Sequence, residues 1–461
     1  MSKTVNKIHF IAIGGSVMHN LAIALHQRGH QVSGSDDYIF DPSKGKLAQH
    51  GLLPEEFGWF PEKITDQTDF VVLGMHARPD NPELKKAQDM GVKIYSYPEY
   101  IYQSFADKQR VVVGGSHGKT TITAMLLHVF KYHGLPCDYI VGAQLAGYDS
   151  TVKITADAPV AIIEGDEYLS SPIDRTSKFL HYRPHVGCIT GIAWDHINIF
   201  KTFEAYTQVF AQFADTFVEG GKLFFNAQDP ELATICSKQR QGLTQTPYQE
   251  HPHKIVDNQT VLLTEQHGEV KVKLFGNHNM QNLAVAKAMC LQLNLSEAQF
   301  YEAIPSFMGA SRRMEKIAES NGKAVFKDFA HAPSKVTATT QALKKQYANR
   351  NLVACLELHT FSSLNKDFLG QYHHALQAAD TAVVFFNPEA IALKKLETIN
   401  ADDIKAAFGQ SNLTVFDQSA QLVDFLHAQS WGATNLLMMS SGNFDNLDLK
   451  LLAEEIVIAG K

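Results

Sequence analysis

A phosphate-binding loop is the most specific chemical pattern in this chain of 461 residues. Residues 111–113 are all valine and predict a buried strand, and an apolar-periodic helix is predicted from Ile122 onward. Between them lies the run Gly114-Gly115-Ser116-His117-Gly118-Lys119-Thr120-Thr121. Such a turn directs backbone N–H groups and a helix N-terminus at an anion. Lys119 would reach the outer phosphates of a nucleotide, and the Thr120 hydroxyl would bind Mg²⁺. An ordinary strand-turn-helix junction is the alternative.

Two further predicted strands of the same region are followed by side chains that suit this chemistry. The apolar run 160–163 ends at Glu164, and the run 186–190 is followed by Trp194, Asp195 and His196. Ligands of parallel sheets bind at the carboxyl ends of the strands, so the side chains of Glu164 and His196 are both expected beside the phosphate loop. Glu164 stands where a Mg²⁺ ligand belongs, and His196 is a candidate functional histidine. An exposed acidic turn and a structural histidine are the alternatives.

Amide side chains occur at the start of a later predicted helix. His278 and Asn279 follow Gly276, and Asn282 lies one turn after Asn279, so the two amides can face the same way. Amides in this position suit recognition of a base, and they suit helix capping equally well.

Polar residues also follow the predicted strands nearer the C-terminus, beyond a probable hinge at 309–313. Asp328 ends one strand and is followed by His331 and Pro333, while His359 and Ser441 follow two others. We expect these residues to lie along one edge of a further sheet.

Composition predicts several soluble domains. The chain is 45% apolar and 19% charged, and its 41 basic and 48 acidic residues leave a net charge of −7, which argues against a general nucleic-acid binder. Five cysteines lie far apart with no Cys-x-x-Cys pair, as is typical of free thiols in a reducing cytoplasm. No apolar run reaches ~18 residues, so we expect a cytoplasmic protein without membrane insertion.

Strands and helices alternate throughout, which predicts an α/β protein with three domains, each on a mainly parallel doubly wound sheet. The expected domains are residues 1–106, 107–310 and 311–461, the central one of the P-loop ATPase type. In the first, Gly14, Gly15 and Ser16 follow a strand, and a later strand ends near Ser35 and Asp36. The Gly-x-Gly-x-x-Gly fingerprint is absent, so a nucleotide diphosphate is expected there, with a nicotinamide dinucleotide as the alternative.

Taken together, these patterns resemble the Mur ligase family, which joins amino acids or peptides to UDP-N-acetylmuramate. The first turn at residues 13–15 resembles that of the branch using UDP-N-acetylmuramate itself. Six further motifs follow in the family's order: residues 115–121, Glu164 to Tyr168, Asp195-His196, His278-Asn279 with Asn282, Arg312 to Glu315, and Asp328 with His331 and Pro333. The resemblance runs the whole length of the chain, and six motifs in order are very specific.

The resemblance implies an ATP-dependent carbon–nitrogen ligase that uses Mg²⁺ and forms an acyl phosphate. It implies that Lys119 and Arg313 contact phosphate and that Thr120, Glu164 and His196 hold Mg²⁺. The implied ATP site is completed by His278, Asn279, Asn282, Asp328 and His331. The implied UDP-N-acetylmuramate site consists of Gly14, Gly15, Ser16, Ser35, Asp36 and His76, and the incoming amine would meet His359 and Ser441.

The identity of the amine is the open part of this prediction. Residues 166–168 and 175–182 most resemble the branch that attaches the murein tripeptide L-Ala-γ-D-Glu-meso-diaminopimelate in peptidoglycan recycling. The near alternative is the branch that attaches L-alanine in peptidoglycan biosynthesis. A folylpolyglutamate synthetase and a non-catalytic UDP-sugar sensor are alternatives from other classes. We expect three small-molecule partners, namely UDP-N-acetylmuramate, a peptide and ATP, and we predict no oligomeric state.

Overall fold

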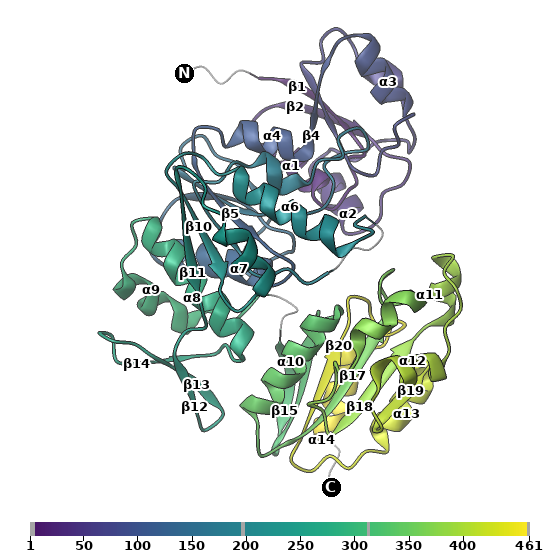
Figure 1. Cartoon of the computed structure of the whole chain (residues 1–461). Helices are drawn as coiled ribbons and strands as arrows, with labels where there is room; N and C mark the ends of the chain where they lie inside the picture. The colour runs from purple at the N-terminus through teal and green to yellow at the C-terminus, as the bar shows by residue number, and fades with distance from the viewer. Residues whose placement is uncertain (1–4, 195–198, 311–313, 459–461) are drawn as a thin grey trace.

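The computed structural model describes residues 5–194, 199–310 and 314–458 of the chain. Helices alternate with mainly parallel strands along three successive stretches, which Figure 1 shows passing from the purple N-terminal part through the teal central part to the yellow C-terminal part. The predicted α/β class with mainly parallel sheets is therefore confirmed. None of the described helices has both the length and the apolar character that a membrane crossing requires. The five cysteines are buried and unpaired, as expected for free thiols.

The first stretch contains a four-stranded sheet in the order β2-β1-β3-β4, in which every neighbouring pair is parallel. Apolar side chains form separate buried clusters on its two faces. The carboxyl ends of β1 and β2 lie at the same edge, so the loops that follow them are neighbours. The strands are β1 (Lys7–Ile11), β2 (Gln31–Ser35), β3 (Phe70–Leu73) and β4 (Lys93–Ser96), and the helices are α1 (Met18–Gln27), α2 (Ser43–Gln49), α3 (Pro82–Asp89) and α4 (Tyr97–Ser104).

The central stretch contains a seven-stranded sheet in the order β11-β10-β9-β5-β8-β6-β7, parallel except at its β6–β7 edge. Strand β5 lies between β8 and β9, so the tips of these three strands are adjacent. A small antiparallel sheet, β12-β13-β14, follows it. The strands are β5 (Gln109–Gly114), β6 (Cys137–Ile140), β7 (Val152–Lys153), β8 (Val160–Glu164), β9 (Val186–Ile189), β10 (Gly221–Asn226), β11 (Leu243–Tyr248), β12 (His253–Val256), β13 (Gln259–Leu263) and β14 (Glu269–Val272). The helices are α5 (Lys119–Tyr132), α6 (Phe203–Asp215), α7 (Pro230–Ser237), α8 (Asn277–Gln292) and α9 (Glu297–Ala303).

The third stretch contains a six-stranded sheet in the order β15-β16-β20-β17-β18-β19, with only its edge strand β15 antiparallel to its neighbour among the described residues. The tips of β16, β20 and β17 therefore lie side by side. The strands are β15 (Glu315–Ser320), β16 (Lys323–Asp328), β17 (Asn351–Leu358), β18 (Thr381–Phe386), β19 (Leu413–Phe416) and β20 (Thr434–Met439). The helices are α10 (Pro333–Gln346), α11 (Pro388–Leu393), α12 (Ala401–Phe408), α13 (Ser419–His427) and α14 (Leu449–Ile458).

Candidate active site

The phosphate loop connects β5 to α5, and its glycines are required by its shape. Gly115 and Gly118 have φ of +122° and +78°, the left-handed region that favours glycine. A Cβ on Gly115 would lie 2.1 Å from Thr190 Oγ1, and a Cβ on Gly118 would lie 2.4 Å from Asn282 Oδ1. Larger residues at either position would therefore clash with the neighbouring strand tip or with α8. Because Gly118 immediately precedes α5, the loop leaves the helix N-terminus open to an anion.

Lys119, the first residue of α5, forms a buried ion pair that the sequence did not predict. Its Nζ donates to the Gly115 carbonyl and to Glu167 Oε2, both at 2.7 Å. Glu167 is only 1% exposed and also accepts from the Tyr206 hydroxyl at 3.0 Å. Burial alone would lower the pKa of Lys119, but the carboxylates of Glu167 and its neighbours outweigh it and raise that pKa. Lys119 is therefore a fixed positive charge at the loop.

Thr120 and Glu164 come together from different elements of the central stretch. The Thr120 hydroxyl donates to Glu164 Oε1 at 2.7 Å, and Gly142 N donates to Glu164 Oε2 at 2.9 Å. Burial, reinforced by Asp166, raises the pKa of Glu164. A hydroxyl and a carboxylate form a donor pair of hard oxygens, which fits Mg²⁺ better than a softer ion. The other predicted metal ligand, His196, lies outside the described residues, as does Arg313.

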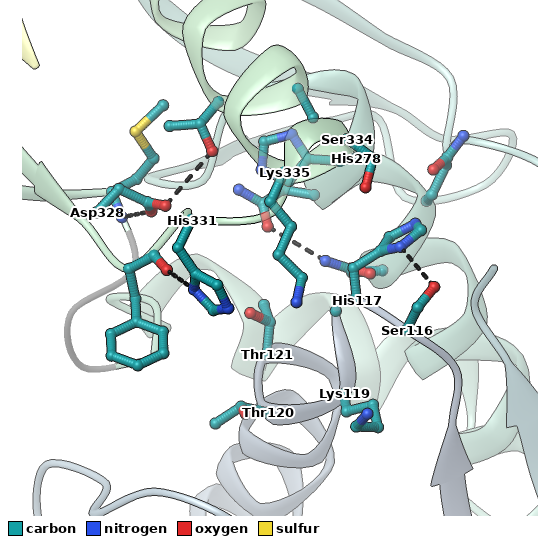
Figure 2. A pocket seen from close by; sticks show the side chains of 18 of the residues that line it. Ser116, His117, Lys119, Thr120, Thr121, His278, Asp328, His331, Ser334 and Lys335 are labelled. Carbon is teal, nitrogen blue, oxygen red and sulfur yellow. Dashed lines mark hydrogen bonds between the residues drawn. The ribbon is translucent and has the colours of Figure 1, made fainter. Parts of the chain in front are cut away.

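A cavity of about 330 Å³ opens between this loop and the third stretch of the chain. Figure 2 shows side chains from both parts pointing into it. Its lining contains most of the predicted ATP-site residues: Ser116, His117, Gly118, Lys119, Thr120, Thr121, Glu164, His278, Asn279, Asn282, Asp328 and His331. Gly115 is not among the lining residues and contributes its carbonyl to Lys119 instead. Ser334 and Lys335 also line the cavity. Nothing in their spacing distinguished these two residues from an ordinary helix start.

Several lining side chains are already ordered by hydrogen bonds. Asp328 accepts from Ala330 N and Met314 N, both at 2.7 Å, so it anchors the segment after residues 311–313. Asn279 donates to the Phe275 carbonyl at 2.9 Å, and the Asn282 amide donates to Asn279 Oδ1 at 3.4 Å. The N-cap of α8 is Gly276, with no side-chain cap bond. Capping therefore does not account for these two asparagines, and Asn282 lies against Gly118 of the phosphate loop.

His117 is partly buried in the loop and is held in its neutral form. Burial, followed by the charges of Lys335, His278 and Lys119, lowers the pKa of His117 to about 4. Its Nδ1 lies 3.2 Å from Ser116 Oγ, which also donates to the Gly191 carbonyl at 2.9 Å. Burial and the neighbouring positive charges thus both favour the uncharged imidazole at this position.

A second cavity, of about 640 Å³, lies between the first and central stretches. Gly15, Ser16 and His76 line it from the first stretch, and Asp166, Tyr168, Ser170, Arg175 and Lys178 line it from the central one. Gly14, Ser35 and Asp36 do not line it. Ser35 is fully buried, and its hydroxyl accepts from Lys63 Nζ at 3.3 Å. Asp36 Oδ2 accepts from Gly14 N at 2.8 Å, which ties the two strand tips together.

Replacing Asp36 with asparagine should change how thermal stability depends on pH. Burial, with a contribution from Asp37, raises the pKa of Asp36 from 3.8 to about 6. The folded protein thus keeps a proton that the unfolded chain releases at lower pH, so this carboxyl removes stability as pH rises from about 4 to about 6. Asparagine does not titrate. The Tm of Asp36→Asn should therefore rise relative to that of the wild type as pH increases over that range. Melting curves between about pH 4 and pH 7 measure this shift, and a constant difference would contradict it.

The two predicted contacts for the incoming amine lie at the neighbouring tips of β17 and β20. His359 Nδ1 is 3.7 Å from Glu357 Oε1, and the buried Ser441 hydroxyl has no hydrogen-bond partner among the described residues. Neither lines the cavity at the phosphate loop. Glu357 was not predicted, yet it is buried and accepts from Phe444 N at 2.8 Å and from the Ser440 hydroxyl. It therefore fixes the loop that carries Ser441.

Comparisons with known proteins match most of the length of the chain. The Mur ligase family catalytic domain matches residues 7–109, the Mur ligase middle domain 113–290, and the Mur ligase glutamate ligase domain 312–442. The chain is 28% identical to a UDP-N-acetylmuramate–L-alanyl-γ-D-glutamyl-meso-2,6-diaminoheptandioate ligase of Haemophilus influenzae, over 96% of this chain and 98% of that one. It is also 28% identical to a UDP-N-acetylmuramate–L-alanine ligase of Carboxydothermus hydrogenoformans, over 97% and 96%. The crystal structure of the UDP-N-acetylmuramate-alanine ligase of Thermotoga maritima superimposes with a TM-score of 0.69 at 21% identity, over 98% of each chain.

Proposed function

The chain belongs to the Mur ligase family of ligases, and we propose that it joins the murein tripeptide L-Ala-γ-D-Glu-meso-diaminopimelate to UDP-N-acetylmuramate at the expense of ATP. This reaction would serve peptidoglycan recycling. The alternative acceptor is free L-alanine, since relatives named for each acceptor match equally well at 28% identity.

One observation carries the proposal. The phosphate loop with Lys119 and the Thr120–Glu164 pair face Asp328 and His331 across a single cavity between two parts of the chain. A site of this kind can bind a nucleotide from both sides and shield its terminal phosphate from water. A non-catalytic UDP-sugar sensor would not need these residues.

Amide formation from a carboxylate requires a leaving group, and ATP supplies it. A carboxylate oxygen on the lactyl group of UDP-N-acetylmuramate attacks the γ-phosphorus of ATP. The bond to the β,γ-bridging oxygen breaks, ADP leaves with that electron pair, and an acyl phosphate is formed. The L-alanyl nitrogen of the acceptor then attacks the acyl carbon. Phosphate leaves, and the proton on nitrogen passes to solvent.

The described residues would act on the first of these steps. Lys119, positively charged and oriented by Glu167, would meet the negative charge that develops on the phosphoryl oxygens. Thr120 and Glu164 would hold Mg²⁺, which supplies further neutralisation of phosphate charge when bound. Asn282 and His278 would contact adenine, and Asp328 the ribose. The roles of His196 and Arg313 stay predictions from the resemblance.

Residues at the tip of β8 line both cavities, which supports a short distance between the two substrates. Glu164 lines the cavity at the phosphate loop, and Asp166 lines the larger one, with Gly165 between them. We assign the UDP-sugar to the larger cavity, where Arg175 and Lys178 offer cations for a diphosphate or a carboxylate. Residues 1–106 would then serve the UDP-sugar, 107–310 ATP, and 311–461 the incoming amine.

The acceptor is tested by comparing kcat/KM for the tripeptide and for free L-alanine. We expect at least about a tenfold preference for the tripeptide, because the tips of β17 and β20 carry polar side chains that suit its extra carboxylates. Phosphate release with UDP-N-acetylmuramate and ATP measures both values, and reactions without acceptor are the control. A preference for L-alanine would establish the alternative ligase, and no acceptor-dependent release with either would contradict the proposed reaction.

A further inference from the structure

Lys335 belongs to the third stretch of the chain but lies in the cavity of the phosphate loop. It is in the first turn of α10, and it lines the same cavity as Lys119 and Thr121. Figure 2 shows its side chain extending from α10 toward the start of α5, with the ammonium group directed at the space above Thr121. Its charge also contributes to the lowered pKa of His117, which places it close to the loop.

A lysine is electrostatically unfavourable at this end of a helix. The N-terminus of an α-helix carries partial positive charge, so cations are stabilising at the opposite end, where α10 has Lys344 and Lys345. Lys335 therefore adds positive charge where the start of α10 is already positive, on the side that faces the phosphate loop.

The rest of the cavity has the same character. Helices α5, α8 and α10 all begin at it, and none of the three has an acidic residue in its first turn. The lining carboxylates, Glu164 and Asp328, each accept hydrogen bonds from protein groups. Three positive helix ends and two lysines thus face one space, as a polyphosphate requires.

We propose that Lys335 is a phosphate-binding residue that contacts the polyphosphate chain of the nucleotide from the C-terminal part of the protein. Lys119 and the loop amides would hold the same chain from the central part. The nucleotide would then join the two parts of the protein through its phosphates. This inference rests on the proposed function, in which the cavity binds ATP.

Nucleotide binding to the full-length protein tests the role of Lys335 without reliance on ligation. Titrations with ATP, ADP and adenosine would compare the wild type, Lys335→Gln, Lys335→Arg and Lys345→Gln. Lys345 is the matched control, because it lies at the other end of α10 and its Nζ donates to Asn277 Oδ1 of α8 at 3.0 Å. That variant removes the same charge between the same two parts of the protein, away from the phosphate loop.

Lys335→Gln should weaken the binding of ATP and ADP about tenfold or more, because a charge-assisted contact to phosphate is lost. Its affinity for adenosine should stay within about twofold of the wild-type value. Lys335→Arg should restore most of the affinity, and Lys345→Gln should bind like the wild type. Unchanged ATP binding by Lys335→Gln would overturn the role of Lys335 but not the proposed function. An equal loss of affinity for adenosine would also overturn that role, because it would indicate a structural effect of the substitution. A wild type that binds no ATP would overturn the proposed function as well.

Discussion

Replacing Lys119 with alanine should reduce ATP-dependent ligation by at least about a hundredfold. The ammonium group is held at the phosphate loop by the Gly115 carbonyl and Glu167. Its raised pKa keeps it charged over the pH range in which the enzyme would be assayed. It is therefore available to stabilise the charge that develops on the transferring phosphoryl group. Acceptor-dependent phosphate release with saturating ATP measures the effect, and near-normal turnover would contradict the assignment of the loop.

The ion pair with Glu167 determines how this experiment must be controlled. Removing Lys119 leaves the buried Glu167 carboxylate without its lysine partner, at a cost of about 3–5 kcal/mol in stability. Lys119→Ala should therefore melt earlier than the wild type, and low activity could reflect unfolding. The double variant Lys119→Ala with Glu167→Gln removes both charges and should recover much of the stability while staying inactive. Glu167→Gln alone keeps the lysine and should lose less activity than Lys119→Ala.

The second large effect is expected for Glu164→Gln. Turnover at ordinary Mg²⁺ should fall by about a hundredfold, since a neutral amide cannot replace a carboxylate as ligand to a hard cation. Higher Mg²⁺ should restore part of it. The measurement is phosphate release as a function of Mg²⁺ concentration, and an unchanged requirement for Mg²⁺ would show that Glu164 does not hold the ion.

Stability and activity should change in opposite directions in this variant. Burial raises the pKa of Glu164 above its ordinary value of 4.5, so the charged carboxylate destabilises the folded state as pH rises. Glutamine has no charge to bury, and it can still accept from Gly142 N. Glu164→Gln should therefore be at least as stable as the wild type near neutral pH without metal. A markedly lower Tm would mean that its loss of activity reflects misfolding.

The parts of the fold that depend on neighbouring residues were predictable from the sequence. The phosphate loop needs two glycines with positive φ, a β-branched strand before it and a helix after it, and all three are local constraints. The same holds for the alternation of strands and helices that confirmed the α/β class. The antiparallel edge strands β7 and β15 were not predicted, because direction in a sheet depends on a partner far away in the chain.

The grouping of the predicted ATP-site residues followed from topology once the strands were recognised. Tips of parallel strands meet at one edge, so Glu164 was expected beside the loop, and its contact with Thr120 is observed. The same rule did not predict that the buried Ser35 hydroxyl accepts a hydrogen bond from Lys63. The predicted roles of His196 and Arg313 fall on residues 195–198 and 311–313, outside those described.

By itself, the sequence determined the phosphate loop, the α/β class and the family, because these depend on residue order and local geometry. Only the tertiary structure decided that Glu167 pairs with Lys119 and that Lys335 enters the cavity from the third stretch. Both arrangements bring together residues that are distant in the chain, and a charged side chain in a buried site is stabilised by whichever groups the fold places beside it. Such electrostatic partnerships leave no periodicity or spacing in the sequence from which they could be predicted.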